Sequence, residues 1–96
     1  MNENLICVAR FTAKEGRLDD LKQALSALVP LTRQEEGCLS YVLHADLQDP
    51  NSLTMIERFR DRAAFDLHSQ SPYLQDFLRI AGALADVIQV NLYGEV

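Results

Sequence analysis

The sequence lacks a long hydrophobic run and any concentration of positive charge. Its apolar segment near the N-terminus, residues 5–9, has no basic leader and is far shorter than the roughly 18 residues that a membrane span needs. The net charge is −5, and the lysines and arginines are scattered singly. A nucleic-acid-binding surface needs clustered positive charge. We therefore expect a cytoplasmic protein that binds neither membranes nor nucleic acid.

Cysteines are few, and the common motifs of cofactor and hydrolase chemistry are absent. Cys7 and Cys38 do not form a CxxC pair, so neither a zinc site nor a redox pair is indicated. Both are interpreted as buried, small apolar residues. The sequence contains no Walker loop, GxGxxG, GxSxG or HExxH motif. Nothing here supports a nucleotide cofactor, serine hydrolysis or zinc proteolysis, and no metal site is expected.

The length and composition indicate one domain spanning residues 1–96. The chain is 48% apolar and 24% charged, which is typical of a globular protein. A chain of this size buries only about 60 to 65% of the surface that its unfolded form exposes. Oligomerisation is therefore expected, because a second subunit would cover more of that surface.

The hydrophobic periodicity predicts four strands and two helical regions. Apolar residues alternate in strands and recur every three or four positions in helices. The predicted elements are a strand at 5–14, a helix at 17–36, a hairpin of strands at 38–47 and 52–60, a helix after Asp61 interrupted at 71–72, and a strand at 86–96. This β-α-β-β-α-β order predicts an α+β, ferredoxin-like split βαβ fold, with a four-stranded antiparallel sheet and helices on one face.

Three residues give further predictions about the shape and the ends of the helices. Pro30 removes one backbone hydrogen bond within the first helix and should kink it. Gly37 is expected to end that helix in a left-handed conformation. Asp61 is a good N-cap for the next helix.

The strands are apolar on both faces. Odd positions of the first strand are assigned to the helix side, and several apolar residues then point the other way; they are Ile6, Val8, Val42, Ile56 and Val87. A monomer seldom exposes a patch of this size. The pattern favours a homodimer whose sheets pack face to face. The alternative is that one strand register is misjudged by one residue.

Polar residues on apolar faces are the candidates for chemistry, because an unpaired buried polar group costs about 1 to 3 kcal/mol. Glu57 shares a strand face with apolar residues, and His68 lies one helical turn after Ala64. A Glu57–His68 pair between sheet and helices would suit acid–base chemistry. The alternative is that the pair only ties helix to sheet.

Other polar residues have simpler interpretations. Arg10 lies on the expected dimer face, where an intersubunit ion pair is more natural than a substrate contact. His44 is expected to be solvated, as are the acidic pairs 19–20 and 35–36 of the first helix. Tyr41 either lends its hydroxyl to a pocket or is an ordinary strand residue.

Four segments together resemble a known family. They are ARFTAKEGRLDDL (9–21), GCLSYVLHADLQDP (37–50), LTMIERF (53–59) and AAFDLHSQSPYLQDF (63–77). In this order they resemble the antibiotic-biosynthesis-monooxygenase domain of the dimeric α+β barrel superfamily, closest in kind to small bacterial quinol monooxygenases. The most specific parts are Glu57 and the pattern of Ala64, His68, Ser71 and Pro72. The resemblance implies a homodimer forming a dimeric α+β barrel.

The resemblance also implies a reaction. Members of the family oxidise quinols, phenols and related compounds with molecular oxygen and without flavin, metal or haem, so no cofactor is expected. By this interpretation His68 is the catalytic base and Glu57 orients it. The substrate cavity would be shaped by four aromatic side chains, those of Phe11, Tyr41, Phe65 and Phe77.

Differences between this sequence and related branches of the family limit the reactions that can be expected. Haem-degrading relatives carry a tryptophan about where His68 stands and a haem-ligating histidine where this chain has Leu78, and this chain contains no tryptophan. A sibling branch isomerises a phosphorylated ketone, but the cationic residues for a phosphate are missing. Two alternatives stay open: an isomerase or tautomerase of a small carbonyl compound, and a non-catalytic dimer that binds a metabolite.

Overall fold

The computed structural model describes residues 3–96, which form four strands and three helices. In chain order the elements are β1 (Leu5–Ala13), α1 (Leu18–Arg33), β2 (Cys38–Ala45), β3 (Ser52–Phe59), α2 (Arg62–Ser69), α3 (Pro72–Leu84) and β4 (Ala85–Gly94). The predicted order of elements is confirmed, including the interruption between α2 and α3. None of the helices in residues 3–96 is both long and apolar enough to cross a membrane.

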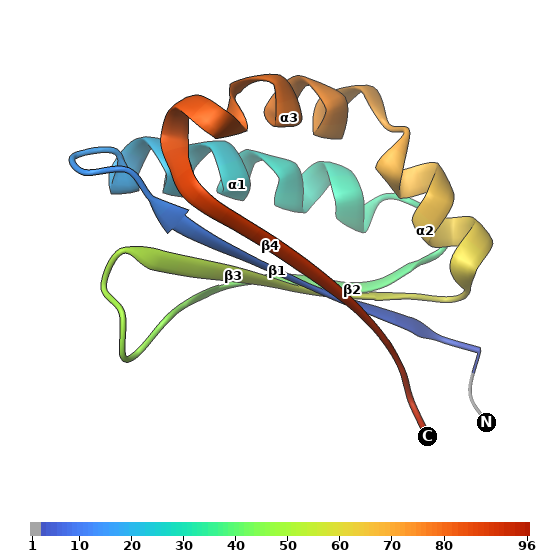
Figure 1. Cartoon of the computed structure of the whole chain (residues 1–96). Helices are drawn as coiled ribbons and strands as arrows, with labels where there is room; N and C mark the ends of the chain where they lie inside the picture. Colours follow the sequence, from blue (N-terminus) through green and yellow to red (C-terminus); the bar gives the residue numbers. More distant parts are fainter. Residues whose placement is uncertain (1–2) are drawn as a thin grey trace.

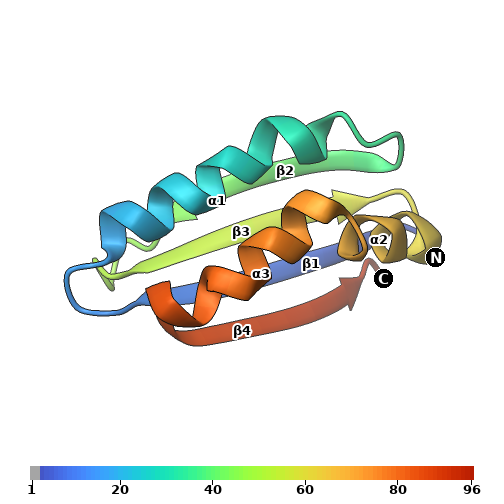
Figure 2. The same ribbon diagram turned by 90° about the horizontal axis from the view of Figure 1, so that it is seen from above.

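The strands form one antiparallel sheet in the order β2-β3-β1-β4. All three helices lie on the same side of this sheet, and the other side is open (Figure 1). Seen from above, α1 runs over the β2 side of the sheet and α3 over the β4 side, while α2 covers one end (Figure 2). The ferredoxin-like fold class is thus confirmed.

The core fills the layer between sheet and helices. In β1 the odd residues are buried and the even ones are half-buried, as the alternation predicts. Leu21 and Leu25 from α1 join Met55 and Phe59 from β3 in one buried cluster. Truncating a buried leucine of this kind typically costs about 2 to 5 kcal/mol. This packing holds α1 in place above the sheet.

The open face of the sheet carries the predicted apolar residues. Val42 and Ile56 are each 40% exposed and Val87 is 45% exposed, although all three lie in strands. Val8 pairs with Ile56, which in turn pairs with Val42, so these side chains are neighbours across three strands. The strand registers are therefore as predicted, and a one-residue error is excluded.

Arg10 lies on this open face but finds its partners in its own chain. Its guanidinium Nη2 is 3.4 Å from Asp49 Oδ2 and donates to Ser52 Oγ at 3.2 Å, and its Nε is 3.8 Å from Asp46 Oδ2. The two aspartates belong to the β2–β3 connection. An intersubunit partner is thus not needed to pair this charge.

The helix ends show one correct and one wrong prediction. The side chain of Asp61 accepts a hydrogen bond from the Ala64 backbone N–H at 2.9 Å, so the predicted N-cap is confirmed. However, α1 ends at Arg33 rather than at 36, and Gly37 does not have the left-handed conformation expected of it. Among residues 3–96 only Gly16 has a positive φ, of 75°.

Gly37 is needed for a different reason, namely the close approach of two segments. A Cβ atom at this position would overlap the Cβ of Ala64 in α2. The Gly37 carbonyl also accepts a hydrogen bond from the Arg60 backbone N–H at 2.8 Å. The absence of a side chain therefore lets the loop after α1 lie against the start of α2.

This contact predicts opposite effects for two glycine substitutions. Gly37→Ala should lower the free energy of unfolding by about 1 to 3 kcal/mol, because the new methyl group must displace α2. Gly82→Ala, in the exposed part of α3 with open space around it, should raise stability by about 0.5 to 1 kcal/mol. Urea unfolding of both variants measures these changes. Equal effects would contradict the packing role of Gly37.

Candidate functional site

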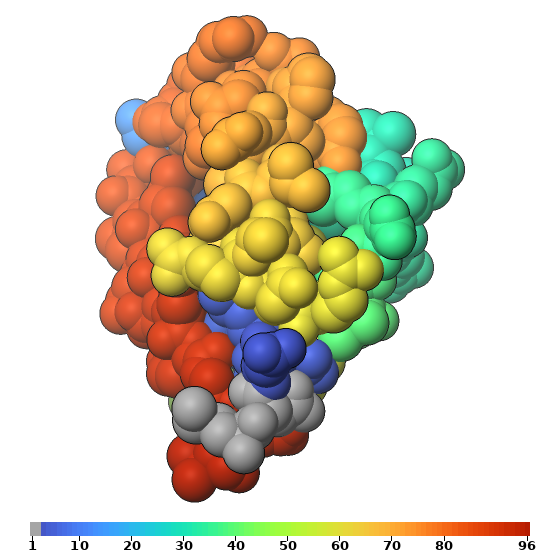
Figure 3. Space-filling model, turned by 90° about the vertical axis from the view of Figure 1, so that its right-hand side faces the viewer, coloured from blue at the N-terminus to red at the C-terminus, as the bar shows by residue number. Residues whose placement is uncertain are grey.

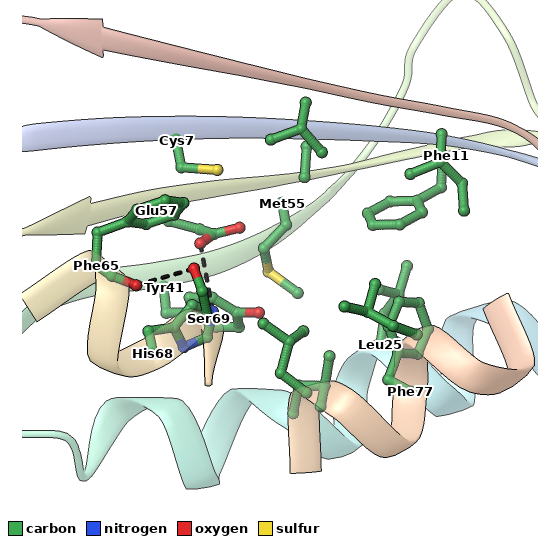
Figure 4. A pocket seen from close by; sticks show the side chains of 16 residues that line it. Cys7, Phe11, Leu25, Tyr41, Met55, Glu57, Phe65, His68, Ser69 and Phe77 are labelled. Atoms are coloured by element: carbon green, nitrogen blue, oxygen red, sulfur yellow. Dashed lines mark hydrogen bonds and ion pairs between the residues drawn. The ribbon is translucent and has the colours of Figure 1, made fainter. Parts of the chain in front are cut away.

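A cavity of about 180 Å³ lies between the sheet and the helices (Figure 4). Its walls come from all four strands and all three helices. The residues that line it are Cys7, Ala9, Phe11, Leu25, Leu28, Tyr41, Met55, Glu57, Phe65, His68, Ser69, Leu74, Phe77, Leu78, Ile88 and Val90. All six site residues predicted from the sequence, His68, Glu57, Phe11, Tyr41, Phe65 and Phe77, are in this set.

The sheet presents Glu57 to the cavity between two polar neighbours. In the antiparallel registers, Glu57 of β3 pairs with Cys7 of β1 on one side and with Tyr41 of β2 on the other. Because these three residues share one face of the sheet, their side chains all point toward the helices, as Figure 4 shows. Glu57 is only 5% exposed, so its carboxyl group is almost removed from water.

The His68 side chain extends from α2 toward Glu57 and its two neighbours in the sheet. It is 3% exposed, and aromatic rings surround its imidazole. The ring centroid of Phe59 is 4.9 Å away and that of Tyr41 is 5.4 Å away. These contacts fix the plane of the imidazole. The alternating strand and the amphipathic helix thus bring His68 and Glu57 to the same cavity, as their positions in the sequence predict.

The two ring nitrogens of His68 have different surroundings. Nδ1 is 3.0 Å from Oε2 of Glu35, which is hydrogen-bond distance. Nε2 is 3.7 Å from Oε1 of Glu57, which is too long for a hydrogen bond but close enough for electrostatic interaction. The hydrogen bond that orients the imidazole therefore comes from Glu35, whereas Glu57 faces the nitrogen on the cavity side.

Glu35 and Tyr73 are site residues that the sequence pattern does not predict. Glu35 was expected to be a solvated helix residue, but it follows the end of α1 and its side chain is only 21% exposed. The Tyr73 hydroxyl, from the first turn of α3, donates a hydrogen bond to the same Oε2 that contacts His68. No periodic pattern signals these contacts, because they depend on where α1 ends.

Burial raises the pKa of three cavity side chains, Glu57, Cys7 and Tyr41, and so favours their uncharged forms near neutral pH. Desolvation raises the pKa of Glu57 from 4.5 to about 8, a hydrogen bond from the Cys7 thiol opposes this rise, and the negative charge of Glu35 adds to it. Burial, with Glu57 nearby, raises the pKa of the Cys7 thiol to about 12. Burial also raises the pKa of Tyr41. Glu57 is thus mainly a neutral acid that can donate a hydrogen bond.

The cavity opens toward β4. Three of its lining residues are strongly exposed, Leu78 of α3 and Ile88 and Val90 of β4. The inner side of β4 is therefore only partly covered by helix, and the apolar side chains there form the entrance. A ligand entering by this route would pass the apolar side chains of Leu78, Ile88 and Val90.

Other candidate residues lie elsewhere. His44 is exposed, as predicted, and its Nδ1 lies 3.0 Å from the Val42 carbonyl oxygen. Cys7 is buried as expected, but Cys38 is half-buried. Among residues 3–96, no three histidine, cysteine or acidic side chains are arranged to hold a metal ion.

Comparison with known proteins identifies the family. The family model "Antibiotic biosynthesis monooxygenase" matches residues 4–80. A Mycobacterium tuberculosis protein named "Putative monooxygenase Rv0793" is 33% identical over 84 residues, which cover 88% of this chain and 82% of that protein. This chain therefore belongs to the antibiotic biosynthesis monooxygenase family, as the resemblance implied.

Solved structures agree with this assignment. The crystal structure of SO0527 from Shewanella oneidensis has a TM-score of 0.96 at 34% identity, covering 99% of this chain and 93% of that one. The structure of PA3566 from Pseudomonas aeruginosa has a TM-score of 0.93 at 34% identity, covering 100% and 97%. The chain spans only 63% of another relative, the Synechocystis protein sll1783, at 26% identity over 96% of this chain.

The burial of Glu57 predicts that stability depends on pH. Because its pKa rises from 4.5 to about 8 on folding, the folded protein binds more protons than the unfolded chain between these values. Stability should then fall as pH rises through this window, by up to about 1.4 kcal/mol per pH unit. Glu57→Gln should remove this slope when urea midpoints are compared at pH 5 and pH 8.

The neighbouring Glu36→Gln is the matched control. The Glu36 side chain is 93% exposed, so its removal should leave the slope unchanged. Parallel pH dependence in the wild type and in Glu57→Gln would show that Glu57 is not the group responsible.

Proposed function

We propose that this protein is a cofactor-independent monooxygenase that oxidises a small quinol-like or phenolic compound with molecular oxygen. The observation that carries the proposal is the placement of His68 at the wall of an apolar cavity, with its Nε2 3.7 Å from Glu57 Oε1, which is too far for a hydrogen bond. A buried nitrogen of this kind is suited to accept a proton from a bound hydroxyl group.

The proposed reaction begins with transfer of the substrate hydroxyl proton to Nε2 of His68. The resulting phenolate gives one electron to oxygen, and the radical pair recombines to a peroxide. The carbon that bears the peroxide then loses its C–H proton as the O–O bond breaks, so one oxygen atom stays in the product as a ketone or quinone and the other leaves as water with that proton and the one first taken by His68. The substrate supplies the electrons. The protein supplies the base and a site from which water is excluded.

The cavity supports a small, uncharged aromatic substrate. Apart from the polar groups around Glu57 and His68 its walls are largely apolar, with Phe11, Phe65 and Phe77 among them, and none of its lining residues is lysine or arginine. The volume of about 180 Å³ is slightly larger than a protein cavity of about 150 Å³ that holds benzene. Neutral Glu57 would donate a hydrogen bond to the substrate oxygen as it becomes negative.

The proposal includes a homodimer and a cytoplasmic location. The dimer is supported by the apolar open face of the sheet, on which Val8, Val42 and Ile56 lie side by side. Burying this face against a second copy would remove a patch that monomers rarely expose. No nucleic-acid or membrane partner is proposed.

Oxygen consumption tests the enzymatic proposal. Purified protein incubated with menadiol under air should consume oxygen faster than the background, and His68→Ala should lower kcat by about 100-fold or more, because the base is lost. His44→Ala is the control, since His44 is exposed and lies outside the cavity. Equal rates for wild type and His68→Ala would remove the proposed role of His68.

The same purified protein can be used to test the two alternative functions, an isomerase or tautomerase and a non-catalytic dimer that binds a metabolite. An isomerase or tautomerase would exchange a substrate C–H proton for solvent deuterium without oxygen, because proton abstraction alone is reversible. A protein that only binds a metabolite would show neither activity but would unfold at a higher temperature with its ligand. Exchange without oxygen uptake would favour the isomerase.

Paired isoleucine substitutions test the dimer. Ile56→Glu places a charge on the open sheet face, whereas Ile80→Glu places the same charge on the exposed side of α3. Sedimentation equilibrium should show a dimer for the wild type and for Ile80→Glu and a monomer for Ile56→Glu, because burying an unpaired charge is costly. A monomeric wild type would contradict the homodimer.

A further inference from the structure

Glu35 contacts His68 but does not line the cavity, so its position suggests an indirect role. We propose that Glu35, held in place by Tyr73, is a positioning residue that keeps the His68 proton on Nδ1 and thereby leaves Nε2 free to act in the cavity. This inference rests on the proposed function, because the choice of nitrogen matters only if a bound substrate gives up a proton there.

The hydrogen bonds at Glu35 determine the position of this proton. A carboxylate can only accept hydrogen bonds, so Nδ1 at 3.0 Å from Oε2 must be the donor. Tyr73 donates to the same oxygen, and burial next to Glu35 raises the pKa of Tyr73 to about 12, so its hydroxyl keeps its proton. Two donors therefore converge on one oxygen. In a neutral imidazole the other nitrogen, Nε2, is then unprotonated.

The surroundings of the other nitrogen fit this arrangement. Neutral Glu57 has one proton to donate, and Nε2 has one lone pair to accept a proton. Their separation of 3.7 Å is too wide for a direct hydrogen bond. A substrate hydroxyl group entering beside them would donate to Nε2 and accept from Glu57. If Nε2 carried the proton instead, both groups would be donors and the substrate proton would have no acceptor.

Glu35 also compensates the charge that forms during the reaction. When Nε2 takes the substrate proton, His68 becomes a cation in a buried site, which is unfavourable without a negative partner. The Glu35 carboxylate is that partner and is already in contact with Nδ1. The same proton later returns from Nε2 to the peroxide oxygen that leaves as water. The proton on Nδ1 stays in place throughout.

Glu35 is accessible from a second cavity, whereas His68 is not. This second cavity, of about 240 Å³, is lined by Glu35, Glu36, Gly37, Arg60, Ala64, Leu67, Ser71 and Tyr73. In Figure 3, α2 (yellow) lies between β4 (red) on one side and the end of α1 (green) on the other. The apolar cavity opens beside β4, and the second cavity lies beside the segment after α1. A small anion from solvent can thus reach the position of Glu35 without entering the substrate site.

This access allows a chemical rescue experiment. Glu35→Ala should lower kcat with menadiol roughly 10- to 100-fold with little change in KM, because the substrate contacts are kept and the positioning is lost. Formate should restore a large part of the lost kcat by occupying the place of the carboxylate. Glu36→Ala is the matched control, and it should keep the wild-type rate with or without formate.

Two results of the rescue experiment would overturn the inference. One is wild-type kcat in Glu35→Ala, and the other is a loss that formate does not reduce. His68→Ala with formate is a further control, which should stay inactive because formate replaces the positioning group and not the base. If Glu35→Ala does not fold, Glu35→Gln keeps the volume and removes the charge, and the expected loss is again in kcat.

A spectroscopic measurement tests the inference without any activity. In the wild type labelled with ¹⁵N in its histidine rings, the neutral His68 ring should show a protonated Nδ1 and an unprotonated Nε2. Glu35→Ala should lose this preference, while the exposed His44 should be unchanged. A protonated Nε2 in the wild type would overturn the inference even if the enzyme were active. Absence of oxygen consumption with the expected tautomer would instead overturn only the proposed function.

Discussion

The burial of His68 and Glu57 in one apolar layer is the constraint on which the rest of the site depends. Ionisable side chains are costly to remove from water unless they are neutral or paired. The protein meets this cost in two ways, since Glu57 is mainly neutral and His68 is hydrogen-bonded to Glu35. The two are coupled, because the negative charge of Glu35 also helps to keep Glu57 protonated. The three residues therefore act as one electrostatic unit.

This unit depends on the short segment between α1 and β2. Since α1 ends at Arg33, the chain turns early and brings Glu35 toward α2. The segment can approach α2 closely because Gly37 has no side chain to meet Ala64. Its backbone is tied to the end of β3 through the hydrogen bond between Arg60 and Gly37. A glycine that does not line the substrate cavity thus helps to place Glu35 next to the imidazole.

The sequence predicts the cavity better than it predicts the hydrogen bonds around it. Alternation in β3 places Glu57 on the helix side, and helical spacing places His68 on the sheet side, so both could be assigned from periodicity. The same strand and helix periodicities place the aromatic side chains of the cavity on the side between sheet and helices. Periodicity gives the direction of a side chain within an element and nothing about a loop. Glu35 lies in a loop, and its partners His68 and Tyr73 are distant in sequence, so this part of the site required the three-dimensional structure.

Positive charge on the open sheet face is paired within the same chain, as the contacts of Arg10 show. Its guanidinium group is already neutralised by Asp46 and Asp49 of the same chain, and the hydroxyl of Ser52 completes the cluster. The second arginine of this face, Arg58, also has a partner in its own chain, since its Nη1 lies 3.7 Å from Glu95 Oε1. Any association through this surface would involve little attraction between unlike charges. Added salt, which screens such attraction, would leave its strength nearly constant.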